Sequence, residues 1–133
     1  KNAIKSTLMS NSSEQKYDEY NFKKILKKTN EYVIKNDSNF YFIYLPMLER
    51  YVQCSRFKPC KKERLYKKKL QDQKQTVKKI IDDLGIYFID IDQDVFSKEE
   101  DKLKLFPFGI LDHYNAEGYY KVASKVYNII LNR

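Results

Sequence analysis

The sequence predicts an α/β fold in which helices flank a parallel sheet, and three observations support this class. Segments 40–45 and 86–91, FYFIYL and IYFIDI, are continuous runs of aromatic and β-branched residues. Runs that are apolar on both faces are typical of strands covered by helices on both sides, as in parallel sheets. Residues 63–84, between the two runs, have helical periodicity and provide the crossover that a pair of parallel strands requires.

Three helices are expected around these strands, at residues 14–35, 63–84 and 116–131. Apolar side chains recur in each helix at the spacing of one helical face. Asn115 is the expected N-cap of the last helix, and Gly85 stands where a left-handed residue ends the second. The side chains expected to face the core are Phe22, Ile25, Leu26, Tyr32 and Val33 in the first helix, Tyr66, Leu70, Val77, Ile80, Ile81 and Leu84 in the second, and Val122, Ala123, Val126, Ile129 and Ile130 in the third.

The length of 133 residues fits one domain. Residues 1–13 are polar and weakly periodic, so we expect a flexible N-terminal segment there and a single domain at residues 14–133. A sheet of only two strands is not stable by itself. We therefore expect the chain to be only part of a larger α/β domain, or to form a homodimer through an unpaired sheet edge.

The net charge is +8, and aromatic residues make up 15% of the chain. So high an aromatic content excludes a disordered segment. The lysines are interspersed with acidic residues, as on a solvated surface, so nucleic acid is not the expected partner, and a basic nucleic-acid-binding domain is kept as an alternative. No apolar run approaches the ~18 residues that a membrane-spanning helix needs, so no membrane span is expected in this chain.

Cys54 and Cys60 enclose only five residues. Either a local disulfide or two free thiols fits this spacing, and a disulfide would favour an extracytoplasmic location, with a cytoplasmic one left open. The spacing is not that of a zinc site. Asp90, Asp92 and Asp94 alternate, but no glycine turn or distal glutamate completes a calcium loop. No cofactor and no metal ion is therefore expected.

His113 is the only histidine, and it precedes the last expected helix. A histidine in such a loop lies at one end of the sheet, where α/β proteins place their sites. The segment from Phe106 to Tyr119, FPFGILDHYNAEGY, resembles the final block of SGNH/GDSL hydrolases, in which the catalytic histidine is followed by a polar helix start and a glycine–aromatic pair. The pattern HxNxxGY is formed here by His113, Asn115, Gly118 and Tyr119.

Residues 42–46 and 84–90 are also similar to strands of that family, so the resemblance covers residues 38–131. It implies a flavodoxin-like three-layer sandwich of which this chain is the C-terminal portion. It also implies a serine esterase acting on a small-molecule or glycan ester. In such an enzyme a serine attacks the carbonyl, a histidine moves the proton, and an acid orients the histidine.

The chain departs from the family pattern at two points. The acid of the family stands three residues before the histidine, where this chain has Ile110. We expect Asp112 to take this role, with Asp94 and Asp101 as alternatives. In addition, no glycine-containing serine block is present, because all three glycines lie in the C-terminal half. The sequence thus predicts a chain that supplies the histidine without the nucleophile. A non-catalytic SGNH-like binding module is the other interpretation.

Overall fold

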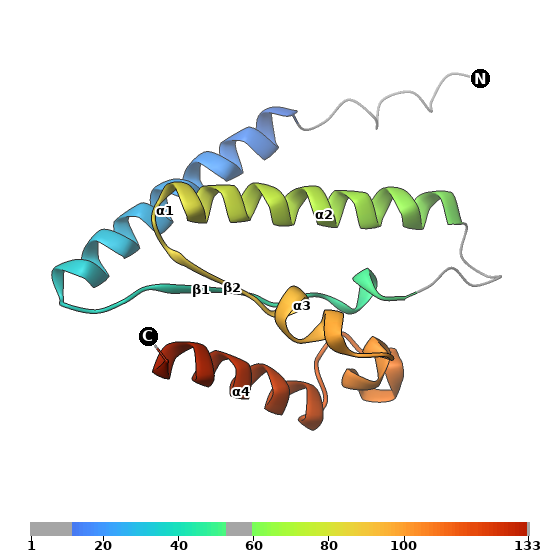
Figure 1. Cartoon of the computed structure of the whole chain (residues 1–133). Coiled ribbons are helices and arrows are strands. Elements are labelled where there is room, and N and C mark those ends of the chain that lie inside the picture. The colour runs from blue at the N-terminus through green and yellow to red at the C-terminus, as the bar shows by residue number, and fades with distance from the viewer. Residues whose placement is uncertain (1–11, 53–59, 133) are drawn as a thin grey trace, which may run out of the picture.

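The computed structural model describes residues 12–52 and 60–132, and the side chains of residues 19–52 and 64–132. Two long helices and two short strands form the first part of the fold (Figure 1): α1 (Ser12–Lys35), β1 (Tyr41–Tyr44), α2 (Cys60–Asp83) and β2 (Tyr87–Asp90). A 3-10 turn, η1 (Leu48–Arg50), follows β1. The second part begins with the short helix α3 (Ile91–Asp94), continues through three 3-10 turns, η2 (Phe96–Lys98), η3 (Lys102–Leu105) and η4 (Pro107–Gly109), and ends with α4 (Ala116–Leu131).

The two strands pair in parallel, as the sequence predicted, and Tyr41 is opposite Tyr87 at the start of the ladder. The register brings Tyr44 opposite Asp90, so both strands end at the same edge of the sheet. Helices cover both faces: α1 and α2 pack on one, and α4 packs on the other (Figure 1). The α/β class is therefore confirmed. The described residues do not form a complete flavodoxin-like sandwich, because their sheet has only two strands.

The predicted helices form, with small differences at their ends. α4 has the predicted bounds, and the Asn115 side chain accepts a hydrogen bond from the Gly118 amide as an N-cap. Gly85 ends α2 with a left-handed φ of 64°. α1 begins at Ser12, so the end of the segment predicted to be flexible is already helical, and residues 1–11 lie outside the described residues.

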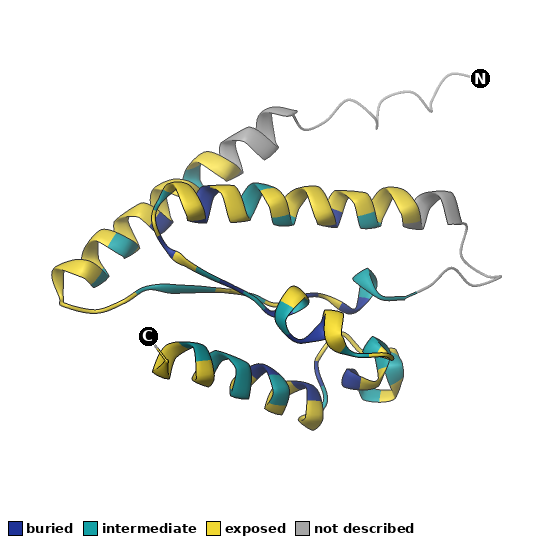
Figure 2. Cartoon of the chain, viewed as in Figure 1, coloured by how far each residue is buried: buried dark blue, intermediate teal, exposed yellow. Residues whose placement is uncertain are grey.

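The apolar stripe of α1 is narrower than its sequence suggested. Phe22 and Leu26 pack against α2 and the sheet, and the Asn30 side-chain amide donates to the Leu84 carbonyl at 3.2 Å. Ile25 and Tyr32, which we expected in the core, are 63% and 70% exposed. They lie outside the stripe because α1 contacts the rest of the described chain along one side only. Figure 2 shows this in the largely exposed surface of α1.

The segment between β2 and α4 contributes most of the fully buried large side chains, although it has no regular periodicity. Phe96, Leu105 and Phe106 are at most 1% exposed and form one core with Ile89 and Val122. The aromatic rings of this core lie next to one another, with Phe96 and Phe106 centroids 5.6 Å apart. Turns rather than a third strand therefore fill the space between the sheet and α4.

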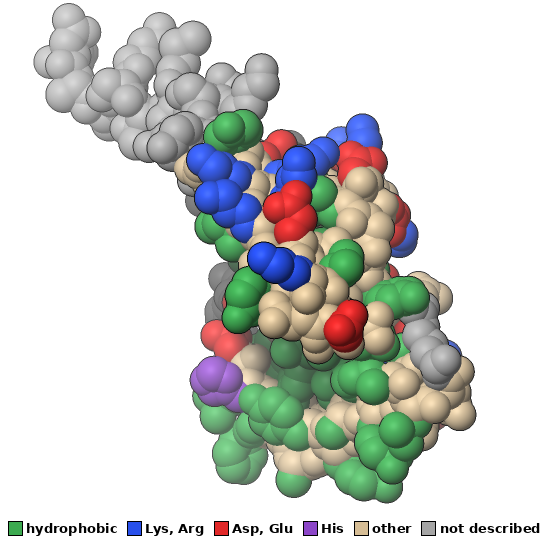
Figure 3. Space-filling view, turned by 90° about the vertical axis from the view of Figure 1, so that its left-hand side faces the viewer, with side chains coloured by type: hydrophobic (Ala, Val, Ile, Leu, Met, Phe, Trp, Pro, Cys, Tyr) green, Lys and Arg blue, Asp and Glu red, His purple; other side chains and the backbone are tan. Residues whose placement is uncertain are grey.

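The α4 side of the sheet is covered unevenly. Ile89 of β2 is 2% exposed, whereas its register partner Ile43 of β1 is 38% exposed. Leu45 and Met47, which continue the same row beyond β1, are about half exposed. Hydrophobic side chains also gather on the lower part of the molecule in Figure 3, below the charged side chains of the upper helical layer. None of the described helices is both long and apolar enough to span a membrane.

Candidate functional site

The carboxyl edge of the sheet brings together the loop that carries His113 and the ends of both strands. Pro46 follows β1 and is fully buried. Its carbonyl accepts a 2.6 Å hydrogen bond from the hydroxyl of Tyr114, which is itself 8% exposed. Because Tyr114 is the neighbour of His113, this bond fixes the histidine loop at the edge where open α/β sheets place their sites.

The residues around His113 that match the HxNxxGY pattern have clear structural roles. The Asn115 side chain accepts from the Gly118 amide at 2.9 Å and donates to the Lys104 carbonyl at 2.6 Å. The Asn115 amide donates to the Leu105 carbonyl at 2.9 Å. A Cβ atom on Gly118 would lie 2.6 Å from that same carbonyl oxygen, so only glycine allows this approach. Asn115 and Gly118 thus hold the start of α4 against η3.

His113 and Asp112 are both exposed, in a bend between η4 and α4. Within the described parts of the chain, neither side chain has a hydrogen bond or an ion pair. The Asp112 carboxylate therefore does not contact the His113 ring. The other two acids considered are engaged elsewhere: Asp101 accepts from the Leu103 amide at 3.0 Å, and Asp94 lies 3.8 Å from the Lys125 ammonium. Ile110, at the position of the family's acid, is 72% exposed.

A cluster of charged residues at the same edge was not predicted from the sequence. The Asp92 carboxylate accepts a hydrogen bond from the Tyr51 hydroxyl at 2.6 Å. The same carboxylate lies 2.9 Å from the Arg50 guanidinium and 2.9 Å from the Lys74 ammonium. Lys74 also pairs with Asp90 at 2.8 Å. These residues come from η1, α2, β2 and α3, so no local sequence pattern links them. The nearest signal was the alternation of aspartates at 90, 92 and 94, whose carboxylates pair with cations of the protein.

Burial and pairing set the protonation states in this cluster. Burial alone would raise the pKa of Asp92, but the hydrogen bonds from Tyr51 and Lys74 and the charge of Arg50 outweigh it and lower that pKa. Burial alone would lower the pKa of Lys74, and its hydrogen bonds to Asp90 and Asp92 raise it instead. Burial also raises the pKa of the Tyr51 hydroxyl, which therefore stays protonated and donates. The cluster is a set of fixed charges that tie four elements together.

Glu49, in η1, contributes a second kind of feature to this edge. One of its carboxylate oxygens, Oε2, is buried and has no hydrogen-bond partner among the described residues. Buried carboxylate oxygens in proteins nearly always have a donor.

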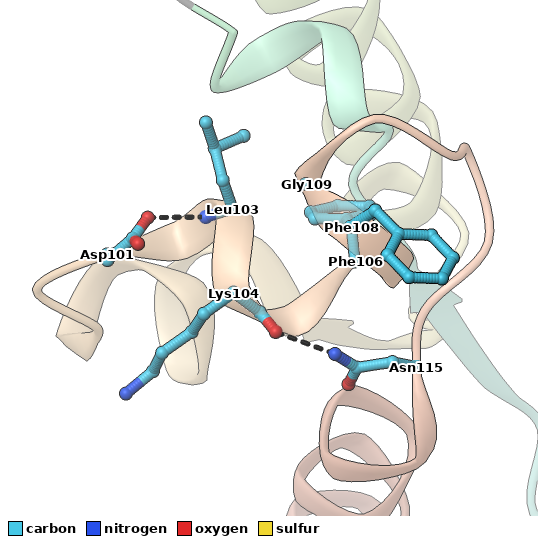
Figure 4. Close-up of a pocket in the computed structure, with 7 residues that line it drawn as sticks. All are labelled: Asp101, Leu103, Lys104, Phe106, Phe108, Gly109 and Asn115. Carbon is cyan, nitrogen blue, oxygen red and sulfur yellow. Dashed lines mark hydrogen bonds between the residues drawn. The ribbon is translucent and has the colours of Figure 1, made fainter.

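A shallow pocket lies beside the histidine loop, between η3 and the start of α4 (Figure 4). Its lining includes the apolar residues Leu103, Phe106 and Phe108, of which Phe106 is almost fully buried. Gly109 and Asn115 stand at the two ends of the loop that contains His113. Asp101 and Lys104 complete the lining. Phe108 is the most exposed of the large apolar side chains, at 90%.

The described residues contain no group of three or more His, Cys, Asp or Glu side chains that could hold a metal ion. Cys54 lies outside the described residues, as does the side chain of Cys60, so the disulfide considered above is not described here. Comparison with family models, with curated proteins and with solved structures found no match to the chain.

Proposed function

We propose that the chain is the C-terminal part of an SGNH/GDSL-like ester hydrolase and that His113 is its catalytic histidine. The observation that carries the proposal is the 2.6 Å hydrogen bond from the Tyr114 hydroxyl to the Pro46 carbonyl. This bond ties the histidine loop to the carboxyl end of a parallel strand, where α/β enzymes assemble their sites. The exposed ring of His113 is open to a nucleophile that approaches from outside.

In the proposed reaction a serine hydroxyl attacks the ester carbonyl carbon while His113 takes the hydroxyl proton. The ring then gives this proton to the departing alcohol. Water hydrolyses the acyl-serine in a second step that uses the same proton transfers. The substrate class is a small-molecule or glycan ester, and Asp112 is the proposed orienting acid.

The serines in the described chain are poorly placed for this role. Ser38 precedes β1 and so lies at the opposite edge of the sheet from the histidine loop. The Ser97 hydroxyl donates to the Gln93 carbonyl at 2.6 Å, and Ser124 is in the middle of α4. Because the sequence also has no glycine-containing serine block, we assign the nucleophile to polypeptide outside these 133 residues.

Hydrolysis of p-nitrophenyl butyrate tests both halves of the proposal. The chain alone should show background hydrolysis, and a fluorophosphonate probe should label none of its serines. A longer polypeptide that adds a serine block should turn the ester over, and His113→Ala should lower its kcat by about a thousandfold or more. Tyr120→Ala, at an exposed aromatic on α4, is the matched control. An unchanged kcat in the histidine variant would remove the catalytic assignment.

A specific observation favours a second candidate, a non-catalytic SGNH-like binding module. No carboxylate of the described chain pairs with His113, and Ile110 occupies the position of the family's acid. The longer polypeptide distinguishes the two candidates, because a binding module would show neither ester turnover nor fluorophosphonate labelling.

The edge of β1 that has no strand partner among the described residues is the proposed surface for a homodimer. Ile43 on this strand is 38% exposed, while Ile89 at the same level of β2 is 2% exposed. Pairing of two β1 edges would give a sheet of four strands, and a sheet of three or more strands with an apolar face can be stable by itself. It would also cover the row formed by Ile43, Leu45 and Met47.

A further inference from the structure

Basic charge is concentrated in one layer of the fold. Over residues 19–35 and 64–83, α1 and α2 carry twelve lysine and arginine side chains and five acidic ones, a net charge of +7. The other side chains that the structure describes, at residues 36–52 and 84–132, include six basic and ten acidic ones, a net charge of −4. Lys and Arg side chains gather over the upper helices in Figure 3. The layer of α1 and α2 therefore complements an anionic partner.

On α1, five exposed residues form one stripe along the helix. Lys24, Lys28, Tyr32 and Lys35 are spaced by four, four and three positions, and Ile25 lies next to them. This spacing puts all five on one side of the helix. We call these residues the α1 stripe. Because α1 uses another side to pack against α2 and the sheet, the stripe faces solvent.

The three lysines of the α1 stripe have no hydrogen bond or ion pair with any other described residue. Next to them, the Lys23 ammonium lies 3.3 Å from the Asp83 carboxylate. Lys27 pairs with Glu31 at 3.9 Å, and Glu31 is the only acidic residue from position 24 to position 35. The positive charge of the stripe is thus not neutralised by the part of the chain that the structure describes.

The apolar residues of the stripe favour a lipid surface over nucleic acid. Ile25 and Tyr32 are 63% and 70% exposed, so the core of the described chain does not account for them. Aliphatic and aromatic side chains beside lysines insert at the boundary between lipid headgroups and acyl chains. A sugar–phosphate backbone offers an aliphatic side chain no comparable contact. In addition, only one of the twelve basic residues in the layer is arginine, the residue that suits bidentate recognition of phosphates and bases.

We propose that the α1 stripe binds the surface of an anionic phospholipid bilayer. Lys24, Lys28 and Lys35 lie against the negatively charged headgroups, and Ile25 and Tyr32 enter the interface. α1 then lies along the bilayer without crossing it. Because α4 packs on the opposite face of the sheet, the acidic part of the described chain points away from the membrane (Figure 1). Ester hydrolysis has no part in this contact.

Co-sedimentation of the full chain with vesicles measures the binding. Vesicles of phosphatidylcholine with about 30% phosphatidylserine should sediment the protein at low ionic strength, and vesicles of phosphatidylcholine alone should not. Added salt should weaken the binding, because it screens the lysines from the headgroups. A fluorescein-labelled DNA duplex, followed by anisotropy in the same buffer, should bind more weakly than these vesicles at an equal concentration of anionic charge.

The stripe variant replaces three lysines: Lys24→Gln, Lys28→Gln and Lys35→Gln. Its partition coefficient should be about a hundredfold lower, because each lysine near an anionic surface contributes about fivefold. The matched control removes the same charge from three exposed positions of α2: Lys68→Gln, Lys69→Gln and Lys79→Gln. This control should retain most of the binding, since it leaves the stripe intact.

Ile25→Ser changes the apolar part of the stripe at constant charge. It should weaken vesicle binding about tenfold, because the isoleucine contact with the acyl boundary is lost. Ile34→Ser, at an isoleucine 61% exposed on another side of α1, should leave binding unchanged. Circular dichroism should give the wild-type helix content and Tm for every variant, because each substituted side chain is exposed.

Four results would each overturn the inference. These are no binding to the phosphatidylserine vesicles at low ionic strength, equal losses in the two lysine variants, equal losses for Ile25→Ser and Ile34→Ser, and a DNA duplex bound more tightly than the vesicles. None of these measurements involves ester turnover, so membrane binding and the proposed hydrolase activity can fail separately.

Discussion

At the scale of single residues, two positions explain why the histidine loop has one conformation. Gly118 lets α4 approach the Leu105 carbonyl so closely that a Cβ atom would lie 2.6 Å from its oxygen. Tyr114 fills the core below the loop and donates its hydroxyl to the Pro46 carbonyl. Both residues determine how the loop and the start of α4 pack, and both lie within five positions of His113. Part of the histidine motif is therefore a requirement for local geometry.

Gly118→Ala should destabilise the fold by about 1–3 kcal/mol, because the added methyl group forces α4 away from η3. Urea denaturation followed by circular dichroism measures the free energy of unfolding. Asn128→Ala, on the exposed side of the same helix, should stay within about 0.5 kcal/mol of the wild type. If Gly118→Ala is as stable as this control, the close contact between α4 and η3 is not required.

Tyr114→Phe keeps the ring and removes only the buried donor. The Pro46 carbonyl then loses its partner, so a loss of about 1–3 kcal/mol is expected in the same denaturation experiment. Tyr119→Phe, at a tyrosine 54% exposed, is the matched control and should have little effect. The His113 ring signals in NMR should broaden or shift in the first variant alone. Identical spectra would mean that the hydroxyl does not fix the loop.

At the scale of elements, the Asp92 cluster joins η1 and α2 to the junction of β2 and α3, three segments that are far apart in the sequence. Arg50 comes from η1, Lys74 from α2 and Asp90 from the end of β2, while Asp92 is in α3. Removing one member of a partly buried ion cluster leaves the opposite charge without its partner, which costs more than the pair itself contributes. The cluster therefore sets how η1 and α3 meet at the carboxyl edge.

The cluster predicts a loss of stability in acid. The pKa of Asp92 is lower in the folded chain than its ordinary value of 3.8, so its contribution is present above that value. This contribution disappears as the pH falls through the lowered, folded-state pKa. Unfolding free energies of the wild type and Asp92→Asn should therefore differ at pH 7 and converge toward pH 2. Glu100→Gln, at an exposed acid, should follow the wild type throughout, and parallel curves for Asp92→Asn would contradict the assignment.

At the scale of the whole molecule, the described chain leaves several large apolar side chains exposed. Ile43, Leu45 and Met47 along β1, and Ile25 and Tyr32 on α1, remain at the surface. Apolar rows next to an unpaired strand edge are typical of surfaces that another polypeptide covers. The sheet of two strands leaves the β1 row partly uncovered, and α1 contacts the rest of the described chain along one side only.

The oligomeric state tests the β1 edge. Size-exclusion chromatography with light scattering should give a mass that rises toward twice 16.1 kDa with concentration. Ile43→Lys should shift the protein to the monomer, because charged side chains protect an edge strand from pairing. Ile34→Lys, on exposed α1, should not. A monomer at every concentration would exclude this dimer and leave the edge to another partner.

The sequence alone determined the regular elements. The apolar runs at 40–45 and 86–91 became the two parallel strands, and Asn115 and Gly85 were identified as the caps of α4 and α2. These features are local, because the alternation of apolar residues and the preferences of capping residues act over a few positions. The position of His113 before the last helix was local in the same way.

Only the tertiary structure decided which charges and rings meet. The Asp92 cluster joins positions up to 42 residues apart, from Arg50 to Asp92, and the irregular segment from η2 to η4 fills the core without any periodic signal. The tight approach at Gly118 likewise depends on the packing of α4 against η3. Such contacts depend on the three-dimensional path of the chain, because neither burial nor ion pairing is encoded by neighbours in sequence.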